Sequence, residues 1–322
     1  MSTRVRILLV TALWGGLWGL WGLGSLSGVP GAPHVAFAED ADAYFKQGIA
    51  YKQEGKTDQA IEALEHAVAA NPRHFMAWAS LGNLYKTKKD IPRAVAAYEH
   101  AAQGMKKDKI VWANLGMAYY RNNQFDQALS ALVTASKLDP NDAEIRGNLG
   151  TVRRQKGDLP GAIADLEAAV KLKPDDAQFA NNLGVAYRFA KREADAIKVF
   201  QKAIELAPND ASFHFNLAVA YRRQTDKNPD MISQAIGEYE KATSLDPGNA
   251  EGWFDLGFMY KQDHQNDKAI AAFNKYLELN KGKDASGQKR IEDELGALGS
   301  AAPGDKADKK PKGGTKKPAP KK

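Results

Sequence analysis

The chain has 322 residues and contains no cysteine, which excludes disulfide scaffolds, thiolate zinc sites, thiol catalysis and a lipidated N-terminal cysteine. Its net charge of +6 is unevenly spread, because residues 1–38 carry +2, residues 301–322 carry +6 and the long middle part carries −2. The basic pI therefore comes from the two ends, and this argues against nucleic acid as a partner of the folded part.

The first 38 residues have the order of a secretory signal. Arg4 and Arg6 precede an uncharged, leucine-rich stretch that ends in Ala-Phe-Ala at 36–38, directly before two acidic residues. A basic start, an apolar centre and a small-residue cleavage site direct a chain to export. We therefore expect 1–38 to be a cleaved signal peptide and the mature protein to be periplasmic. The alternative is an uncleaved anchor in the inner membrane, since the apolar run approaches the ~17–25 residues that span a bilayer.

One pattern then recurs along the chain, with Gly116, Gly150 and Gly184 each 34 residues apart. The first half of a copy has the form Trp-x-x-Leu-Gly-x-x-Tyr, and the second half places an alanine, a large residue and another alanine before a closing proline. The complete first half begins at Trp78, Trp112 and Trp253. Positions three and four apart share one helical face, so each copy predicts a pair of amphipathic helices.

This spacing resembles that of the tetratricopeptide repeat family over residues 41–283. The resemblance implies an all-α fold, a right-handed superhelical solenoid of seven helix-turn-helix repeats whose first helices line a concave groove. We expect a signal peptide at 1–38, the repeats within 39–283, a capping helix at 284–300 and a disordered Lys/Pro/Ala-rich tail at 301–322. The expected repeats are 41–74, 75–108, 109–142, 143–176, 177–210, 211–249 and 250–283.

Two copies depart from the pattern. The fourth has Arg146 and Arg153 in slots that are usually aromatic, and we expect looser packing there. The sixth has His214 in an aromatic slot and carries five extra residues, which should bulge from the turn between its helices. In two other turns, Gly55 and Gly157 are expected to take the left-handed conformation that ends a helix.

The predicted partner site is the concave groove. The slot two residues before the glycine holds an asparagine in four successive copies, at Asn114, Asn148, Asn182 and Asn216. An amide both donates and accepts, so such a row suits the backbone of an extended partner, and it is similar to the asparagine ladder of the transferases that add N-acetylglucosamine to proteins. A second row suits acidic side chains or a carboxylate and consists of Arg154, Arg188 and Arg222.

Phe215 and Phe254, beside the groove, are predicted as apolar anchors for the partner. Alternative interpretations stay open for all of these residues. Asparagine is common in this slot of the family, an arginine row also forms a solvated face, and the two phenylalanines also suit simple packing. The full carboxylate clamp of chaperone-binding relatives is not clearly present.

The motifs of a phosphate loop, a nucleophile elbow and a zinc protease are absent from the sequence. His66 and His100 share a slot of adjacent copies and suit surface residues better than metal ligands. We therefore predict an exported, non-enzymatic adaptor that needs no cofactor or metal and holds a protein or peptide segment in its groove. The alternative function is an accessory of cell-envelope polysaccharide or wall-polymer assembly. The lysine-rich tail suits a solubilising segment, a tether to an anionic envelope surface or, less well in an exported protein, a DNA-binding tail.

Overall fold

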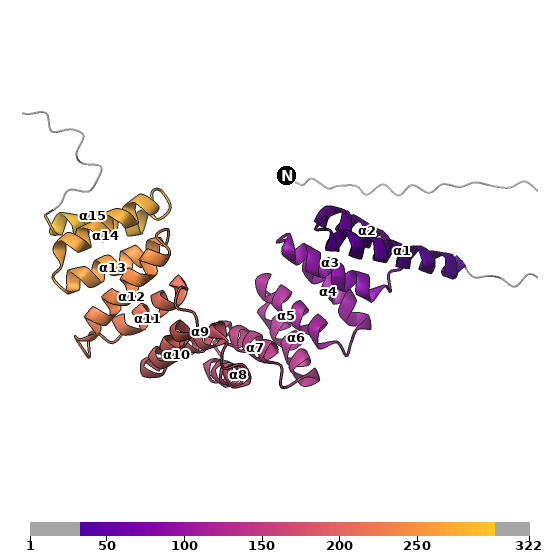
Figure 1. Ribbon diagram of the computed structural model, residues 1–322, viewed down its shortest axis with the longest axis horizontal. Helices are drawn as coiled ribbons and strands as arrows, with labels where there is room; N and C mark the ends of the chain where they lie inside the picture. The colour runs from indigo at the N-terminus through magenta and orange to yellow at the C-terminus, as the bar shows by residue number, and fades with distance from the viewer. Residues whose placement is uncertain (1–32, 300–322) are drawn as a thin grey trace, which may run out of the picture.

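The computed structural model describes residues 33–299, and every regular element in this range is an α-helix (Figure 1). The predicted tail and the first 32 residues of the predicted signal lie outside the described residues. The helices are α1 (Pro33–Gln53), α2 (Thr57–Ala70), α3 (Phe75–Thr87), α4 (Ile91–Gly104), α5 (Lys109–Arg121), α6 (Phe125–Leu138), α7 (Ala143–Gln155), α8 (Leu159–Leu172), α9 (Ala177–Phe189), α10 (Glu193–Leu206), α11 (Ala211–Arg222), α12 (Met231–Leu245), α13 (Ala250–Gln262), α14 (Asn266–Leu279) and α15 (Ala285–Ala297).

The predicted all-α solenoid of seven hairpins and a capping helix is confirmed. Helices α1 to α14 pair in sequence as hairpins, and the hairpins stack into an arc whose two ends turn to the same side (Figure 1). The capping helix α15 covers the last hairpin with Ile291 and Leu295, both fully buried. Helix α1 begins at Pro33, before the predicted end of the signal at residue 38. That boundary and the boundaries of the individual repeats stay predictions.

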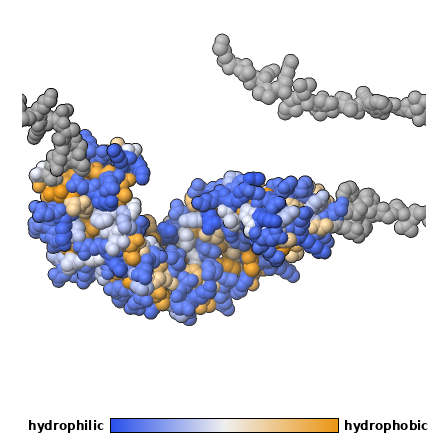
Figure 2. All heavy atoms as spheres, turned by 45° about the horizontal axis from the view of Figure 1, so that its top comes forward, coloured by the Kyte–Doolittle hydropathy of each residue, from blue (hydrophilic) through white to orange (hydrophobic). Residues whose placement is uncertain are grey.

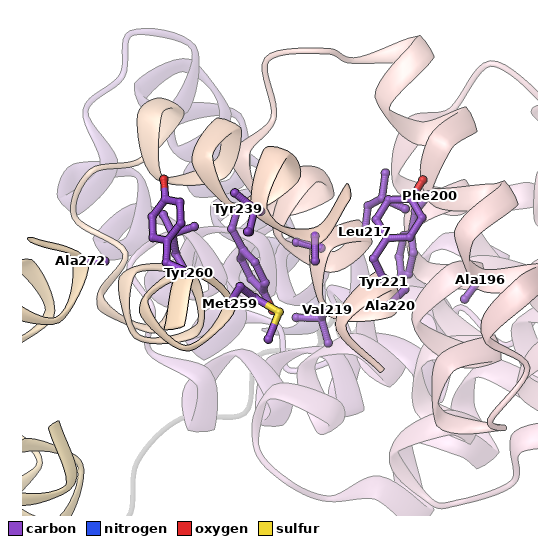
Figure 3. Packing of buried hydrophobic residues seen from close by; sticks show 14 of the residues in the cluster. Ala196, Phe200, Leu217, Val219, Ala220, Tyr221, Tyr239, Met259, Tyr260 and Ala272 are labelled. Atoms are coloured by element: carbon purple, nitrogen blue, oxygen red, sulfur yellow. The ribbon is translucent and has the colours of Figure 1, made fainter. Parts of the chain in front are cut away.

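Six of the seven hairpins close where a glycine of the first helix meets a large residue of the second, and in the sixth Ala218 takes the place of the glycine. A Cβ atom added at Gly184 would lie 2.5 Å from Cε1 of Phe200, and one added at Gly116 would lie 2.6 Å from Cγ of Leu132. Phe200 is fully buried and belongs to a cluster that continues through α11 to α14 (Figure 3). The glycine therefore brings the two backbones close enough for one large side chain to fill the space between them.

The turn inside most hairpins contains one residue in the left-handed conformation. Gly55 and Gly157 have φ angles of +74° and +82°, which confirms the prediction made for them. The same turn slot in four other copies is filled without glycine, by Lys89, Asn123, Lys191 and His264, with φ between 59° and 61°. These four copies accept the strain that a side chain carries at positive φ. In the sixth copy the extra residues lie between α11 and α12, at 223–230, as predicted.

Replacing Lys191 by glycine should stabilise the protein by about 0.5–1 kcal/mol, because glycine adopts positive φ without a clash between Cβ and the following carbonyl. The matched variant Gly157→Ala should destabilise it by a similar amount. Chemical denaturation of the two variants and the wild type checks both signs. A Lys191→Gly variant less stable than the wild type would contradict this explanation.

The tryptophan slot has a polar role in addition to its packing. Nε1 of Trp112 donates to the backbone carbonyl of Lys106, six residues earlier, at 3.0 Å. In the fourth copy Nε of Arg146 donates to the carbonyl of Pro140 at 3.0 Å, and in the sixth Nε2 of His214 lies 2.9 Å from that of Pro208. In each of these copies a side-chain nitrogen in the tryptophan slot bonds to the backbone carbonyl six residues earlier, although the side chains themselves differ.

The fourth copy holds its hairpin with a buried ion cluster, where we expected looser packing. Asp165 on α8 is only 3% exposed, and its carboxylate lies 2.8 Å from Nη1 of Arg146 and 3.1 Å from Nη1 of Arg153. Both arginines come from α7. The two substitutions for aromatic residues therefore act together, since each supplies charge to the same carboxylate.

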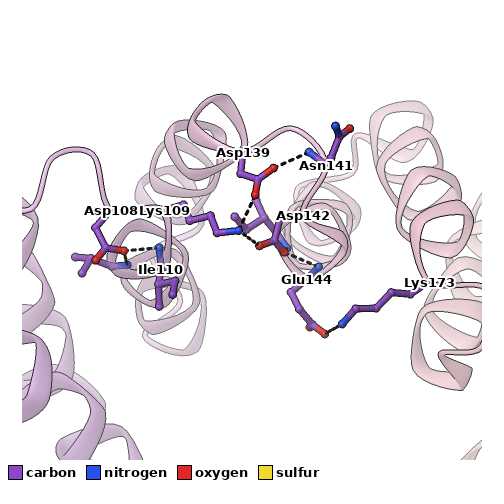
Figure 4. Close-up of polar contacts among 10 residues, drawn as sticks. Asp108, Lys109, Ile110, Asp139, Asn141, Asp142, Glu144 and Lys173 are labelled. Carbon is purple, nitrogen blue, oxygen red and sulfur yellow. Dashed lines mark hydrogen bonds and ion pairs between the residues drawn. The ribbon is translucent and has the colours of Figure 1, made fainter.

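Lys109 ties the third copy to the turn that leads into the fourth (Figure 4). Its Nζ lies 2.6 Å from Oδ2 of Asp139 and 2.7 Å from Oδ2 of Asp142. The hydrogen bond from Lys109 holds the pKa of Asp139 below its ordinary value of 3.8. Burial works to raise the pKa of Asp142, but Lys109 and the backbone amides of α7 lower it overall.

Because both carboxyl pKa values are depressed in the folded protein, their stabilising contribution is complete above the unfolded pKa and is lost as the pH falls through the folded pKa values. Between about pH 6 and about pH 3, the wild type should therefore lose more thermal stability than Lys109→Met, which lacks the partner of both groups. The control is Lys107→Met, which removes a charge from the exposed turn directly before α5. Equal losses in all three proteins would contradict the prediction.

Candidate functional site

The inner face of the arc is lined by the first helices of the hairpins. Helices α5, α7, α9 and α11 contact each other in succession across the repeats, and in Figure 1 α7 and α9 lie inside α8 and α10. Figure 2 shows the hollow between the two arms of the arc. The predicted asparagines and arginines occupy equivalent positions on these helices, so the arrangement brings the asparagine row and the arginine row to one concave surface.

The four asparagines are not equivalent. Asn114 accepts a hydrogen bond of 3.4 Å from Nζ of Lys86. Nδ2 of Asn216 donates to Oδ1 of Asn181, which is itself buried, at 2.9 Å. Asn148 and Asn182 are half-buried, and no other side chain or backbone group within 33–299 bonds to their amides. The central pair is therefore available to a partner, while the outer two are engaged within the chain.

The asparagine row ends in the seventh copy, where Asp255 occupies the same slot. The Tyr239 hydroxyl donates to Oδ2 of Asp255 at 2.9 Å, and Nη2 of Arg222 lies 3.4 Å from the same oxygen. Burial raises the pKa of Asp255, and the Arg222 charge opposes that rise. Arg222 is thus partly neutralised inside the chain, which separates it from the other two arginines of its row.

Arg154 and Arg188 both lie over the ring of Phe189, each with its guanidinium carbon 5.4 Å from the ring centroid. Phe189 is the last residue of α9 and is 53% exposed. Phe189 was not predicted as a site residue, although it directly follows Arg188 in the repeat pattern. The structure therefore brings two predicted arginines together around an apolar ring on the concave surface.

Phe215 and Phe254 pack against the core more than they face the groove. Phe215 is half-buried and meets the Tyr239 ring edge-on, with centroids 5.8 Å apart. Phe254 meets Tyr276 in the same way at 5.2 Å, and the Arg290 guanidinium lies 5.3 Å from its centroid. Phe254 also lines a cavity of about 520 Å³ between α13 and α15. The packing interpretation accounts for Phe215, whereas Phe254 keeps a face on a cavity.

The two histidines considered as ligands lie beside aromatic rings. His100 stacks on Trp78 with centroids 4.4 Å apart, and His66 lies 5.2 Å from Tyr44. Across the part of the chain that the structure describes, no three potential metal ligands of the His, Cys, Asp or Glu type come together. Of the helices between residues 33 and 299, none is both long and apolar enough to cross a membrane.

Comparison with known proteins agrees with the geometry. The family model for the cilia and flagella-associated protein 70 C-terminal domain, of tetratricopeptide type, matches residues 26–246, and a tetratricopeptide repeat model matches residues 238–271. No curated protein sequence matches the chain.

Solved structures share the fold. A tetratricopeptide repeat protein from Parabacteroides merdae is 16% identical with a TM-score of 0.61, covering 81% of this chain and 100% of its own. The pilF protein of Pseudomonas aeruginosa is 21% identical with a TM-score of 0.54, covering 71% and 99%. A chain of the APC/C hetero-tetramer Cut9–Hcn1 is 21% identical with a TM-score of 0.62, covering 79% of this chain and 49% of its own.

The seven stacked hairpins and their lined concave face define a helical-repeat scaffold for protein interaction. The first family match extends over more than half of the chain. The chain belongs to the tetratricopeptide repeat family and has the right-handed superhelical fold of that family. Proteins of this family are typically scaffolds rather than enzymes.

Proposed function

We propose that the protein is a non-enzymatic adaptor whose concave surface holds an extended segment of a partner protein. The central observation is the pair Asn148 and Asn182, which stand in the same slot of neighbouring copies with amides that nothing in 33–299 occupies. Each amide offers a donor and an acceptor to one peptide group, so the pair suits an extended backbone. Backbone contacts of this kind position a segment, and side-chain contacts nearby select it.

A crosslinking experiment tests this function. A photoreactive amino acid placed at residue 151, one helical turn beyond Asn148, should crosslink a partner, and mass spectrometry should map the link to one short segment. The double variant Asn148→Ala/Asn182→Ala should lose most of this product. The matched control Asn141→Ala/Asn209→Ala changes two exposed asparagines in the turns between copies and should keep it. Equal recovery from both double variants would contradict binding through the groove.

We further propose that the adaptor works outside the cytoplasmic membrane, in the bacterial envelope. Support comes from the order of Arg4, Arg6, the apolar stretch and Ala-Phe-Ala at 36–38. Cleavage after residue 38 would leave in the mature chain Ala41, which is fully buried, and Gly48, where α1 meets Leu64 of α2. Cell fractionation and N-terminal sequencing test this, with Glu39 expected as the first residue. An unprocessed chain in the inner membrane fraction would favour the anchor instead.

A second candidate function is an accessory role in envelope polysaccharide or wall-polymer assembly. The cavity beside Phe254 favours it, because aromatic faces combined with a few polar groups, here Tyr276, Asn280 and Arg290, hold small ligands in an orientation. The lysine-rich tail at 301–322 would add attraction to an anionic surface. Purified envelope glycan that binds a tail-deleted protein and is lost from Phe254→Ala would support this role.

A further inference from the structure

The Arg188 side chain is half-buried and forms no direct ion pair within the described residues. Its Nε atom is inaccessible to solvent and has no hydrogen-bond partner in 33–299. Burial lowers the pKa of Arg188 and the nearby Arg223 charge lowers it further, while the Glu193 carboxylate opposes this fall only in part. Removing a charged guanidinium from water costs free energy, and a carboxylate of a bound partner would offset that cost.

The neighbouring arginines divide into two kinds. Arg222 is paired with Asp255, and Arg223 lies 3.7 Å from Oε1 of Glu193. Arg154, like Arg188, has neither an ion pair nor a side-chain hydrogen bond among the described residues. The uncompensated positive charge of this surface is therefore concentrated on α7 and α9, where the two free arginines meet.

Phe189 adds an apolar element at the same point. Both free guanidiniums lie on its ring, yet 53% of the residue remains exposed. The unoccupied amides of Asn148 and Asn182 come from the same two helices. Charge, an apolar face and backbone-binding groups are thus combined on two adjacent first helices.

We propose that this surface recognises an acidic residue in the bound segment, with Arg188 and Arg154 taking the carboxylate and Phe189 contacting an adjacent apolar side chain. The inference rests on the proposed function, because the segment must lie in the concave surface. The arginines of the sixth copy play no part in selection, since Asp255 and Glu193 already occupy them. The carboxylate comes either from an Asp or Glu side chain or from the end of a chain, and both present the same two oxygens to a guanidinium fork.

Fluorescence anisotropy with the full chain tests the proposal. The probes are short, N-terminally labelled peptides of equal length in which leucine alternates with glutamate or with glutamine, both amidated at the C-terminus. A third probe is the glutamine peptide with a free C-terminal carboxylate. The wild type should bind the glutamate peptide about tenfold or more tightly than the amidated glutamine peptide. A gain of the same size for the third probe would assign the site to a chain end.

Arg188→Gln should abolish most of the preference for glutamate, and Arg188→Lys should keep only part of it because lysine lacks the planar fork. The control Arg73→Gln removes the same charge from an exposed turn between the first and second copies and should retain the full preference. Circular dichroism melting establishes that each variant is folded. An unchanged preference in Arg188→Gln, or equal binding of both amidated peptides, would overturn the inference and leave groove binding intact. No binding of any peptide would count against both.

Discussion

Replacing Phe200 by alanine should lower the free energy of unfolding by about 3–5 kcal/mol, the range for deleting a large, buried aromatic side chain. Phe200 is fully buried between α9 and α10, where the ring fills the space left by Gly184. It also belongs to the cluster that runs from the fourth copy to the capping helix (Figure 3). Its loss therefore weakens the closure of one hairpin and the packing of its neighbours.

Chemical denaturation followed by circular dichroism measures this effect, and hydrogen exchange locates it. Opening should become easier in copies four to seven, while α3 and α4, which belong to a separate cluster, should keep their protection. The matched control is Phe189→Ala, a truncation of the same residue type at a 53% exposed position, which should cost at most about 1 kcal/mol. A uniform loss of protection along the whole chain would show that the copies unfold as one cooperative unit.

The positions of the hairpins could be predicted from the sequence because the steric rule behind them is local. In six of the seven hairpins a glycine faces a large residue where the two helices approach closely, as Gly184 faces Phe200, and these glycines recur every 34 residues from Gly48 to Gly184. The turn glycine Gly157 could be predicted for a similar reason. Lys191 in the equivalent turn could not, since its positive φ is imposed by the two helices that it joins and not by its own preference.

The concave site was only half predictable. The positions of Asn148, Arg154 and Arg188 in the repeat predicted that they share one face of the first helices, because helical periodicity determines the face. These positions did not predict which of these polar side chains would bond to a side chain of a neighbouring helix and so be unavailable to a partner. Arg222 is paired with Asp255 and Asn216 with Asn181, and both contacts join residues about one repeat apart. Such competition depends on the distance between stacked helices, which the spacing of a single copy does not contain.

The fourth copy also lacks a hydrogen bond that connects neighbouring copies elsewhere in the array. In the second, third, fifth and seventh copies a tyrosine of the first helix donates to a glutamate on the second helix of the preceding copy. The pairs are Tyr85–Glu65, Tyr119–Glu99, Tyr187–Glu167 and Tyr260–Glu240. Arg153 occupies the tyrosine slot of the fourth copy and turns to Asp165 within its own hairpin. The third and fourth copies therefore lack a tyrosine bond between them, whereas between the fifth and sixth copies Nε2 of Gln201 donates to the Tyr221 hydroxyl at 2.9 Å.

Replacing Asp165 by alanine should cost about 3 kcal/mol, at the lower end of the range for breaking a buried ion pair. The carboxylate is 4% exposed, and its loss leaves Arg146 without a counterion and Arg153 with only Asp158, 3.8 Å from its Nε, although both arginines are about 30% exposed and reach water in part. Hydrogen exchange in α7 and α8 and the midpoint of chemical denaturation measure the loss. A change within about 0.5 kcal/mol would mean that the cluster contributes little net stability.

A control for Asp165→Ala can be designed from the residues that other copies carry in the same slots. Other copies place tryptophan, tyrosine and alanine in the three slots, as at Trp112, Tyr119 and Ala131. The triple variant Arg146→Trp/Arg153→Tyr/Asp165→Ala should therefore recover the stability that Asp165→Ala loses, because an apolar group of matching shape replaces a buried ion cluster at little or no cost. Recovery would show that the ion cluster is one of two equivalent ways to close this hairpin. A triple variant as unstable as Asp165→Ala would show instead that the fourth copy depends on its charges.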